Sequence, residues 1–144
     1  MTAKIAFADA EVGTELPAQT FQVTRDTLVR YAGASGDFNP IHWNDTFATE
    51  VGLDGVIAHG MLTMAQAVRV VTDWVGDPGA VVDYGVRFIR QVKVPNDDKG
   101  ATVEVSAKVA AVVDESARTV RVDLLAKCDG QKVLGMARAV VALA

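Results

Sequence analysis

The sequence predicts an α+β domain in which an antiparallel sheet wraps around one long central helix. Two observations support this fold class. Residues 58–76 form the longest apolar-rich stretch with helical spacing, and their strongly polar positions fall on one narrow stripe. After Gly79 the apolar residues recur at every second position, which is typical of half-buried strands. One such helix followed by a meander of strands indicates an α+β arrangement.

The segment before the long helix is expected to contain a short strand and two short helices. Residues 20–23 predict the strand, and Thr24 can cap a helix that runs to about Ala34. This helix is expected to turn three apolar side chains inward, namely Leu28, Val29 and Ala32. Gly33 and Gly36 are expected to end it.

A second short helix is expected after His42, ending at Gly52. The long helix follows it, and Gly76 and Pro78 are expected to stop that helix. Its narrow polar stripe consists of Gln66, Arg69 and Asp73. Because most of the remaining circumference is apolar, we expect protein to cover the long helix on most sides.

The second half of the chain predicts an antiparallel sheet. Apolar and polar residues alternate in three segments, 82–88, 102–109 and 119–124. Residues 132–143 are apolar on both faces apart from Arg138, as expected of a central strand. The joins between these segments are rich in turn residues, and Asp129-Gly130 is a two-residue hairpin signal.

The composition is typical of one folded domain, residues 1–144. The chain is 50% hydrophobic and 22% charged, and it is long enough to bury a core without disulfides. Its net charge of −4 gives no reason to expect nucleic acid as a partner. A single cysteine, Cys128, excludes an internal disulfide and any site with several thiolates. With only two histidines, a structural metal site is not expected either.

The sequence contains no signal for secretion or for a membrane. The first 13 residues have one lysine, no sustained apolar run and no small-residue cleavage site. The apolar-rich stretch 61–75 carries Arg69 and Asp73 and is too short to span a bilayer. We therefore expect a cytoplasmic protein.

The most informative segment is residues 35–42, Ser-Gly-Asp-Phe-Asn-Pro-Ile-His. It places a carboxylate, Asp37, five residues from one of the two imidazoles, His42. Pro40 cannot continue a helix, and it pushes Asn39 toward extended geometry. The two ionisable side chains are therefore presented across a turn, where they can converge on one small volume. An acid and a base held together in this way are what proton-transfer chemistry needs.

Each residue of this motif also has a structural interpretation. Asp37 is a common turn residue, and His42 taken alone is more simply explained as a histidine satisfied within the fold. Asn39 either orients one of the pair or a water molecule, or it only accepts the geometry that precedes a proline. The pair together favours catalysis, because a turn has no need of a histidine.

His59 and Gly60 lie at the start of the long helix. Free backbone N–H groups and the positive end of the helix dipole point there. Glycine lets a ligand approach the backbone closely, so the carbonyl of an ester or thioester could bind at Gly60. The alternative is that Gly60 only makes the turn into the helix. For His59 a structural role is favoured over a catalytic one.

The remaining candidate residues give weaker signals. Cys128 has no partner histidine in view, so a buried thiol is the favoured interpretation. Arg87, Arg90 and Lys93 are most simply solvated strand residues, with contact to an acidic partner or a phosphate-bearing carrier as the alternative. The sequence contains no GxGxxG, P-loop, GxSxG or CxxC motif.

Residues 31–42, Tyr-Ala-Gly-Ala-Ser-Gly-Asp-Phe-Asn-Pro-Ile-His, and the later His59-Gly60-Met61 closely resemble the hydratase-2 motif of MaoC-like proteins. These are hot-dog-fold (R)-specific enoyl-CoA hydratases and (3R)-hydroxyacyl thioester dehydratases. The resemblance covers essentially the full chain. It implies a hydro-lyase that works on acyl thioesters.

The resemblance also implies roles for four residues. Asp37 and His42 are the catalytic pair, the N–H of Gly60 binds the thioester oxygen, and Asn39 supports the site. We assign the base role to His42 and the acid role to Asp37 in dehydration, although each serves in both directions of a reversible reaction. No metal and no cofactor is implied, because the coenzyme A or acyl carrier protein belongs to the substrate.

Residues 57–64, 74–81 and 94–100 look most like the HadB-type subunit of the actinobacterial (3R)-hydroxyacyl-ACP dehydratase, in type II fatty-acid synthesis. That likeness predicts a sister hot-dog subunit as partner, with a homodimer as the alternative. Residues 65–68 lack the serine that lines the acyl pocket in some homodimeric hydratases, which puts the acyl-chain preference in doubt. Two other functions stay open, a stand-alone (R)-specific enoyl-CoA hydratase and a non-catalytic acyl-binding subunit.

Overall fold

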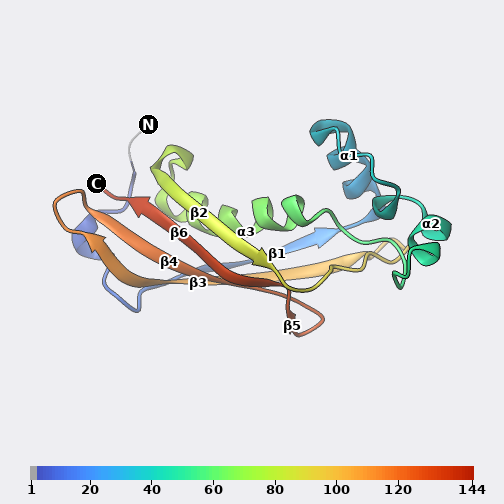
Figure 1. Cartoon of the computed structure of the whole chain (residues 1–144). Helices are drawn as coiled ribbons and strands as arrows, with labels where there is room; N and C mark the ends of the chain where they lie inside the picture. The colour runs from blue at the N-terminus through green and yellow to red at the C-terminus, as the bar shows by residue number, and fades with distance from the viewer. Residues whose placement is uncertain (1–2) are drawn as a thin grey trace.

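One antiparallel sheet curves around helix α3, as Figure 1 shows for the computed structural model, which describes residues 3–144. The strands are β1 (Glu15–Val23), β2 (Val81–Phe88), β3 (Ala101–Asp114), β4 (Thr119–Cys128), β5 (Gln131–Lys132) and β6 (Leu134–Ala142). Their order across the sheet is β1-β3-β4-β6-β2, with β5 paired to β4, and all pairs are antiparallel. The predicted α+β fold is confirmed, in the hot-dog arrangement that the resemblance implies.

The helices divide between the inner face of the sheet and one end of the molecule. They are α1 (Arg25–Ser35), α2 (Asp45–Glu50) and α3 (Gly60–Val75), with the 3₁₀ turns η1 (Phe7–Asp9), η2 (Pro40–His42) and η3 (Pro78–Ala80). In Figure 1, α1 and α2 lie together beyond the N-terminal end of α3. No helix within residues 3–144 combines the length and the apolar character needed to cross a membrane.

Helix α3 packs against the sheet through one side only. Its buried residues are Thr63, Ala67, Val70, Val71 and Val75. Its opposite side is exposed at steps of four residues, at Met61, Ala65, Arg69 and Asp73. The exposure of Arg69 and Asp73 was predicted, but Gln66 is only half-exposed. Apart from Gly60, the other residues of α3 are buried or half-buried, so the expectation that protein covers most of this helix is confirmed, although the exposed stripe also includes apolar residues.

Helix α1 is capped as predicted, but its inward face is narrower. The side chain of Thr24 accepts from the backbone of Thr27 in a capping box. The buried residues of this helix are Leu28 and Ala32. Val29 is exposed, because a neighbour in sequence is rotated by about 100° around the helix axis. Gly33 lies within the helix, and Gly36 ends it in the left-handed conformation with φ of 76°.

Strands β3 and β4 form the centre of the sheet and follow the predicted alternation. Their inward residues are all buried, namely Val103, Val105, Ala107 and Val109 of β3 and Val120, Val122 and Leu124 of β4. The predicted hairpin after β4 is present, since Asp129 and Gly130 have φ of 50° and 70°. The central strand predicted within residues 132–143 is β6, which lies between β4 and the edge strand β2. Only Lys132 of that range belongs to β5 instead.

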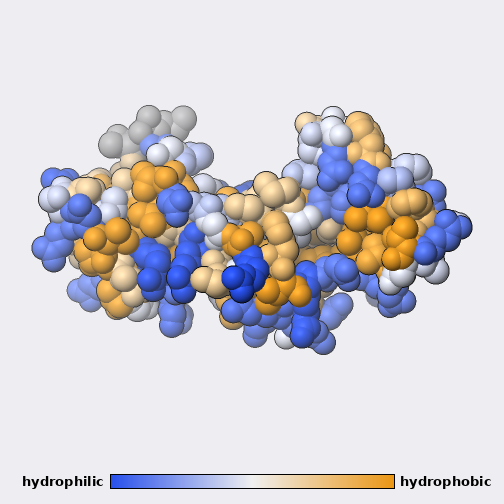
Figure 2. Space-filling model, viewed as in Figure 1, coloured by the Kyte–Doolittle hydropathy of each residue, from blue (hydrophilic) through white to orange (hydrophobic). Residues whose placement is uncertain are grey.

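Strand β2 is an edge strand with apolar side chains in solvent. Val82 and Phe88 are 59% and 52% exposed, although the alternating pattern matched a strand with one covered face. The chain continues from the end of β2 through exposed Ile89 and Arg90 to buried Val92. Figure 2 shows apolar side chains at the surface near this end of β2 and over α1 and α2. This edge borders the cavity described below.

Candidate active site

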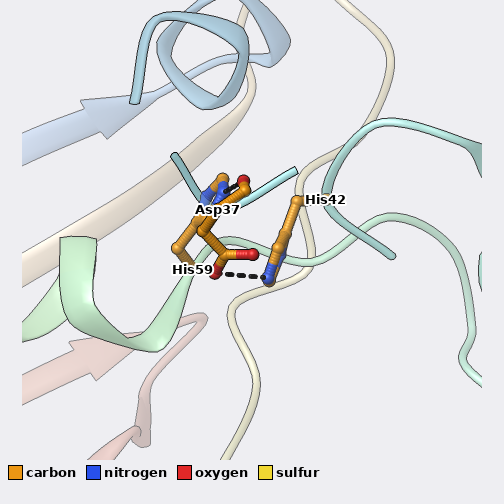
Figure 3. A group of neighbouring side chains, drawn as sticks. All are labelled: Asp37, His42 and His59. Atoms are coloured by element: carbon orange, nitrogen blue, oxygen red, sulfur yellow. Dashed lines mark hydrogen bonds and ion pairs between the residues drawn. The ribbon is translucent and has the colours of Figure 1, made fainter. Parts of the chain in front are cut away.

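Asp37 and His42 face each other across the turn that the sequence predicted (Figure 3). The carboxylate Oδ2 of Asp37 lies 3.8 Å from Nε2 of His42. The Asp37 side chain is 50% exposed and that of His42 is 8% exposed. The carboxylate therefore lies at the surface of the site while the imidazole lies inside it. The backbone N–H of Asn39 donates to Oδ1 of Asp37 at 3.2 Å, which leaves Oδ2 free to face the histidine.

The tautomer of His42 follows from its second contact. Nδ1 lies 2.7 Å from the carbonyl oxygen of Ile57, just before α3. Because a carbonyl can only accept, Nδ1 carries the hydrogen, and Nε2 of the neutral ring holds the free lone pair. That lone pair points toward Asp37 and the open side of the site. His42 is therefore arranged to accept a proton at Nε2.

Asn39 lies in the turn that joins the two residues. Its side-chain oxygen accepts from the backbone N–H of Ile41 at 3.2 Å and caps η2, whose first residue is Pro40. Its own N–H holds Asp37, as described above. Asn39 thus contacts the pair through the backbone, and its side chain shapes the turn. Of the two roles that the sequence left open for Asn39, this placement of its side chain matches the one in which it serves the turn before Pro40.

Gly60 lies with His42 on the wall of a cavity of about 650 Å³. The other lining residues include Ile57, Thr63, Phe88, Arg90 and Leu134. Gly60 is the first residue of α3, so its backbone N–H has no hydrogen-bond acceptor within the helix. A Cβ at this position would lie 3.1 Å from the ring of Phe88, so any larger residue here would crowd the space between this helix start and Phe88.

His59 is part of the site, which sequence reasoning did not predict. Its ring stacks on that of His42, with centroids 3.8 Å apart and an angle of 22° between the planes. Its Nε2 donates to the main-chain carbonyl of Asp37 at 3.1 Å. Burial lowers the pKa of His59 below its ordinary value. The one signal in the sequence was that His59 precedes Gly60 at a helix start. The stack itself could not be predicted, because it joins His59 to His42, which lies in another segment of the chain.

Asp37, His42 and His59 place potential metal-binding atoms within 4.8 Å of one another. Both rings already donate one N–H to a main-chain carbonyl. The lone pair of a ring nitrogen lies in the plane of its ring, and these two planes are stacked nearly parallel. The lone pairs therefore run side by side and do not converge on one ion. The donor geometry does not fit a shared metal.

The other residues singled out from the sequence lie outside the acid–base group. Cys128 is buried, as predicted, and burial raises the pKa of its thiol. Lys93 forms an ion pair with Asp54 at 2.7 Å. Arg90 lines the cavity, and its guanidinium donates to Gln131 at 2.9 Å.

The geometry brings three groups together at one end of the cavity. The imidazole of His42 and the first residue of α3, Gly60, line the cavity, and the carboxylate of Asp37 lies 3.8 Å from that imidazole. This set can move two protons on one face of a bound molecule while the N–H holds a carbonyl oxygen. Residues 7–126 match the family described as MaoC like domain. The chain belongs to this family.

Two curated relatives of this MaoC-like chain carry enzyme names. The 3-hydroxyacyl-thioester dehydratase X of Mycobacterium tuberculosis is 39% identical over 79 residues, which are 55% of this chain and 27% of that protein. The 3-hydroxybutyryl-CoA dehydratase of Methylorubrum extorquens is 32% identical over 114 residues, which are 78% of this chain and 68% of that protein. These names are those of hydro-lyases, so the predicted enzyme class is confirmed at the level of the family.

A solved structure described as a MaoC-like dehydratase superposes with a TM-score of 0.92 and 42% sequence identity. The match covers 96% of this chain and 42% of the other. This chain therefore spans about two fifths of that protein and about a quarter of the tuberculosis dehydratase. The family and the fold follow from these matches.

Proposed function

We propose that this chain is the catalytic subunit of a (3R)-hydroxyacyl thioester dehydratase, which interconverts 3-hydroxyacyl and enoyl thioesters. The observation that carries the proposal is that Asp37 Oδ2 lies 3.8 Å from Nε2 of His42, and that His42 lines the same cavity as Gly60. Both groups act on the same side of the substrate from this position. This supports a syn elimination, in which hydrogen and hydroxyl leave from one face.

In dehydration, Nε2 of His42 takes the proton from the α-carbon of the thioester. The electron pair of that C–H bond forms the double bond, and the C–O bond at the β-carbon breaks. Asp37 enters this step as the neutral carboxylic acid and gives its proton to the hydroxyl, which leaves as water. The proton gained by Nε2 of His42 then returns to Asp37, which restores both groups. The N–H of Gly60 stabilises the negative charge on the thioester oxygen during the step. Hydration runs the same transfers in reverse, so no metal and no cofactor is needed in this scheme.

The substrate is proposed to arrive on coenzyme A or on an acyl carrier protein, both of which bear phosphate. Arg90 supports this, because it lies on the cavity wall while remaining exposed. The HadB-like segments favour the carrier protein and type II fatty-acid synthesis. The buried, unpaired Cys128 suits a reducing compartment, which supports a cytoplasmic location.

A second function, a stand-alone (R)-specific enoyl-CoA hydratase, is favoured by one comparison. The chain covers 68% of a relative whose name specifies a CoA substrate. A non-catalytic acyl-binding subunit is disfavoured, because the chain retains both the acid and the base.

We propose that a second hot-dog domain, on a sister subunit or a second copy, pairs with the edge strand β2. Edge strands with exposed apolar side chains are sites for pairing with another sheet. Val82 and Phe88 on β2 are exposed, and Phe88 borders the cavity. The MaoC-like dehydratase of known structure is more than twice as long as the match, so it has room for another domain of this size.

The test is an assay of the purified chain, alone and co-expressed with a hot-dog subunit. Enoyl-CoA and enoyl-ACP are supplied, and hydration is followed by the loss of enoyl absorbance and by chiral analysis of the product. Turnover of enoyl-ACP only with the partner supports the leading proposal. Turnover of enoyl-CoA by a homodimer favours the stand-alone hydratase. Thioester binding without turnover in every pairing would overturn both.

A further inference from the structure

His59 contacts both members of the acid–base pair at once (Figure 3). Its Nε2 lies 3.1 Å from the main-chain carbonyl of Asp37, and its ring stacks on His42 at 3.8 Å. On another side, the ring of Tyr31 packs edge-on against it, with centroids 4.7 Å apart. His59 is 1% exposed. These contacts hold the ring in one position and one orientation.

The contacts also determine where the hydrogen of His59 lies. The Asp37 carbonyl can only accept, so Nε2 carries the hydrogen. Nδ1 is buried and has no hydrogen-bond partner within residues 3–144. A second proton at Nδ1 would place a buried charge without an acceptor against a ring that must itself accept a proton. The site therefore keeps His59 neutral, and burial acts in the same direction.

Without His59, the ring plane of His42 and the main chain at Asp37 would each be held less firmly. The bond from Nδ1 to Ile57 fixes one atom of the His42 ring but leaves rotation of the ring plane about that bond. The side chain of Asp37 is held at Oδ1 by Asn39, while its backbone follows the helix-ending Gly36 in a turn. The stack fixes the plane of His42, and the hydrogen bond anchors the main chain at Asp37.

We propose that His59 is a positioning residue that keeps Oδ2 of Asp37 and Nε2 of His42 facing each other. In this role His59 does not contact the substrate and takes no part in proton transfer. Its effect on rate rests on the proposed function, whereas its effect on the geometry of His42 does not. The two parts can therefore be tested separately.

The kinetic test uses two variants that each remove one contact. His59→Phe keeps a ring for the stack and loses the donor to Asp37, whereas His59→Gln keeps a donor and loses the stack. We expect kcat to fall about tenfold to a hundredfold in each, with KM within about twofold, since small misplacements of reacting groups have effects of this size. We expect the pH profile of kcat to change in His59→Gln, because His42 loses the ring that stacks on it.

Val71→Ala serves as the control for stability. Val71 is fully buried on the same helix and does not line the cavity. We expect it to lower Tm and leave kcat per folded molecule unchanged. If both His59 variants lower Tm but keep the kcat of the parent, the positioning role is wrong.

Ring ¹⁵N NMR tests the geometry without any assay of activity. The chain has only two histidines, so each ring can be assigned by removing the other. For the neutral rings we expect His42 as the Nδ1–H tautomer and His59 as the Nε2–H tautomer. In His59→Gln we expect a broadened and shifted Nε2 resonance of His42, because its ring is then free to rotate about the bond to Ile57. A charged His59 or an unchanged His42 overturns the proposal. If the NMR result is as expected but no thioester is turned over, the proposed function fails and the positioning role stands.

Discussion

Oδ2 of Asp37 and Nε2 of His42 lie 3.8 Å apart, although one side chain is half-exposed and the other is buried. This separation is longer than a hydrogen bond, so neither group is committed to the other in the free protein. Catalytic contacts are often loose in free enzymes and tighten when substrate binds. The separation therefore adds little to the stability of the fold, and it suits the shared substrate contact proposed above.

We expect Asp37→Asn and His42→Gln each to lower kcat by about 10²–10⁴-fold, because each removes one proton-transfer group. The measurement is steady-state hydration of enoyl thioester by the parent and the variants. Asp26→Asn is the control, since it removes a carboxylate that only pairs with Arg30 on the surface of α1. Parent-like rates in either site variant would remove that residue from the mechanism.

Gly60→Ala is expected to lower kcat/KM by about 10²-fold, a loss comparable to that of one oxyanion donor. The added methyl group would lie 3.1 Å from the Phe88 ring and would stand before the backbone N–H. Gly33→Ala is the matched control, because its Cβ meets nothing within 4 Å inside helix α1. That control should gain about 0.5–1 kcal/mol of stability at full activity. Equal activity of both variants would argue against oxyanion binding at Gly60.

Stability in acid is expected to depend on the pair of Arg25 and Asp45. The two terminal guanidinium nitrogens of Arg25 donate to the carboxylate, at 2.9 and 2.7 Å, and Arg25 holds the pKa of Asp45 below its ordinary value. A lowered folded-state pKa contributes stability above the unfolded value, near pH 4, and the contribution is lost as the pH falls through the folded value. Because Asp45 is largely exposed, Asp45→Asn should cost about 0.5–1 kcal/mol at pH 7.

Urea unfolding of the parent and of Asp45→Asn at pH 7 and at pH 2.5 measures this dependence. We expect the difference in the free energy of unfolding to shrink at the lower pH, because protonation of the carboxylate weakens its pair with Arg25. A difference that persists undiminished there would point to packing and not to the ion pair.

The hydroxyl of Tyr84 should ionise only in strong alkali. Burial raises its pKa to about 12, and it donates to the main-chain carbonyl of Met64 at 2.8 Å, joining β2 to α3. The unfolded chain releases this proton near pH 10, so the folded state loses stability between about pH 10 and 12. A difference titration of the parent against Tyr84→Phe, followed by tyrosinate absorbance, should show the late ionisation. The variant should also be about 0.5–1.5 kcal/mol less stable at pH 7.

Assembly through β2 is expected to be sensitive to charge on that strand. Val82→Lys should weaken the dimer or heterodimer, because it places an ammonium group in the proposed pairing edge. Val113→Lys is the control, since Val113 is similarly exposed but lies on β3. The measurement is sedimentation velocity over a range of concentrations. Dissociation by the β3 variant alone would place the interface elsewhere.

The acid–base pair could be predicted from the sequence because its members are five residues apart across a proline turn. Gly60 could be predicted because a helix start has local signals. The role of His59 could not be predicted in the same way, since its stack depends on how α3 lies against the turn at His42. A contact between segments 17 residues apart leaves no periodic trace in the sequence.

The errors in the predicted fold have a related cause. Val29 was expected inside because apolar residues recur at helical spacing, but the buried stripe of α1 is only wide enough for Leu28 and Ala32. Residues 82–88 alternate as a strand with one covered face would, yet β2 lies at the edge of the sheet. The spacing of apolar residues in the sequence indicates which side chains favour burial. The position of each strand in the sheet decides which of those side chains are buried in the single chain.

Both imidazoles of the site are oriented by main-chain oxygens, His42 by Ile57 and His59 by Asp37. A carbonyl oxygen is present whatever side chain its residue carries. Substitution of Ile57 by another residue of similar shape would therefore keep the hydrogen-bond acceptor of the base in place. Under the proposed function, a substitution at Ile57 would change the wall of the cavity that takes the acyl group while leaving the two proton-transfer groups in place.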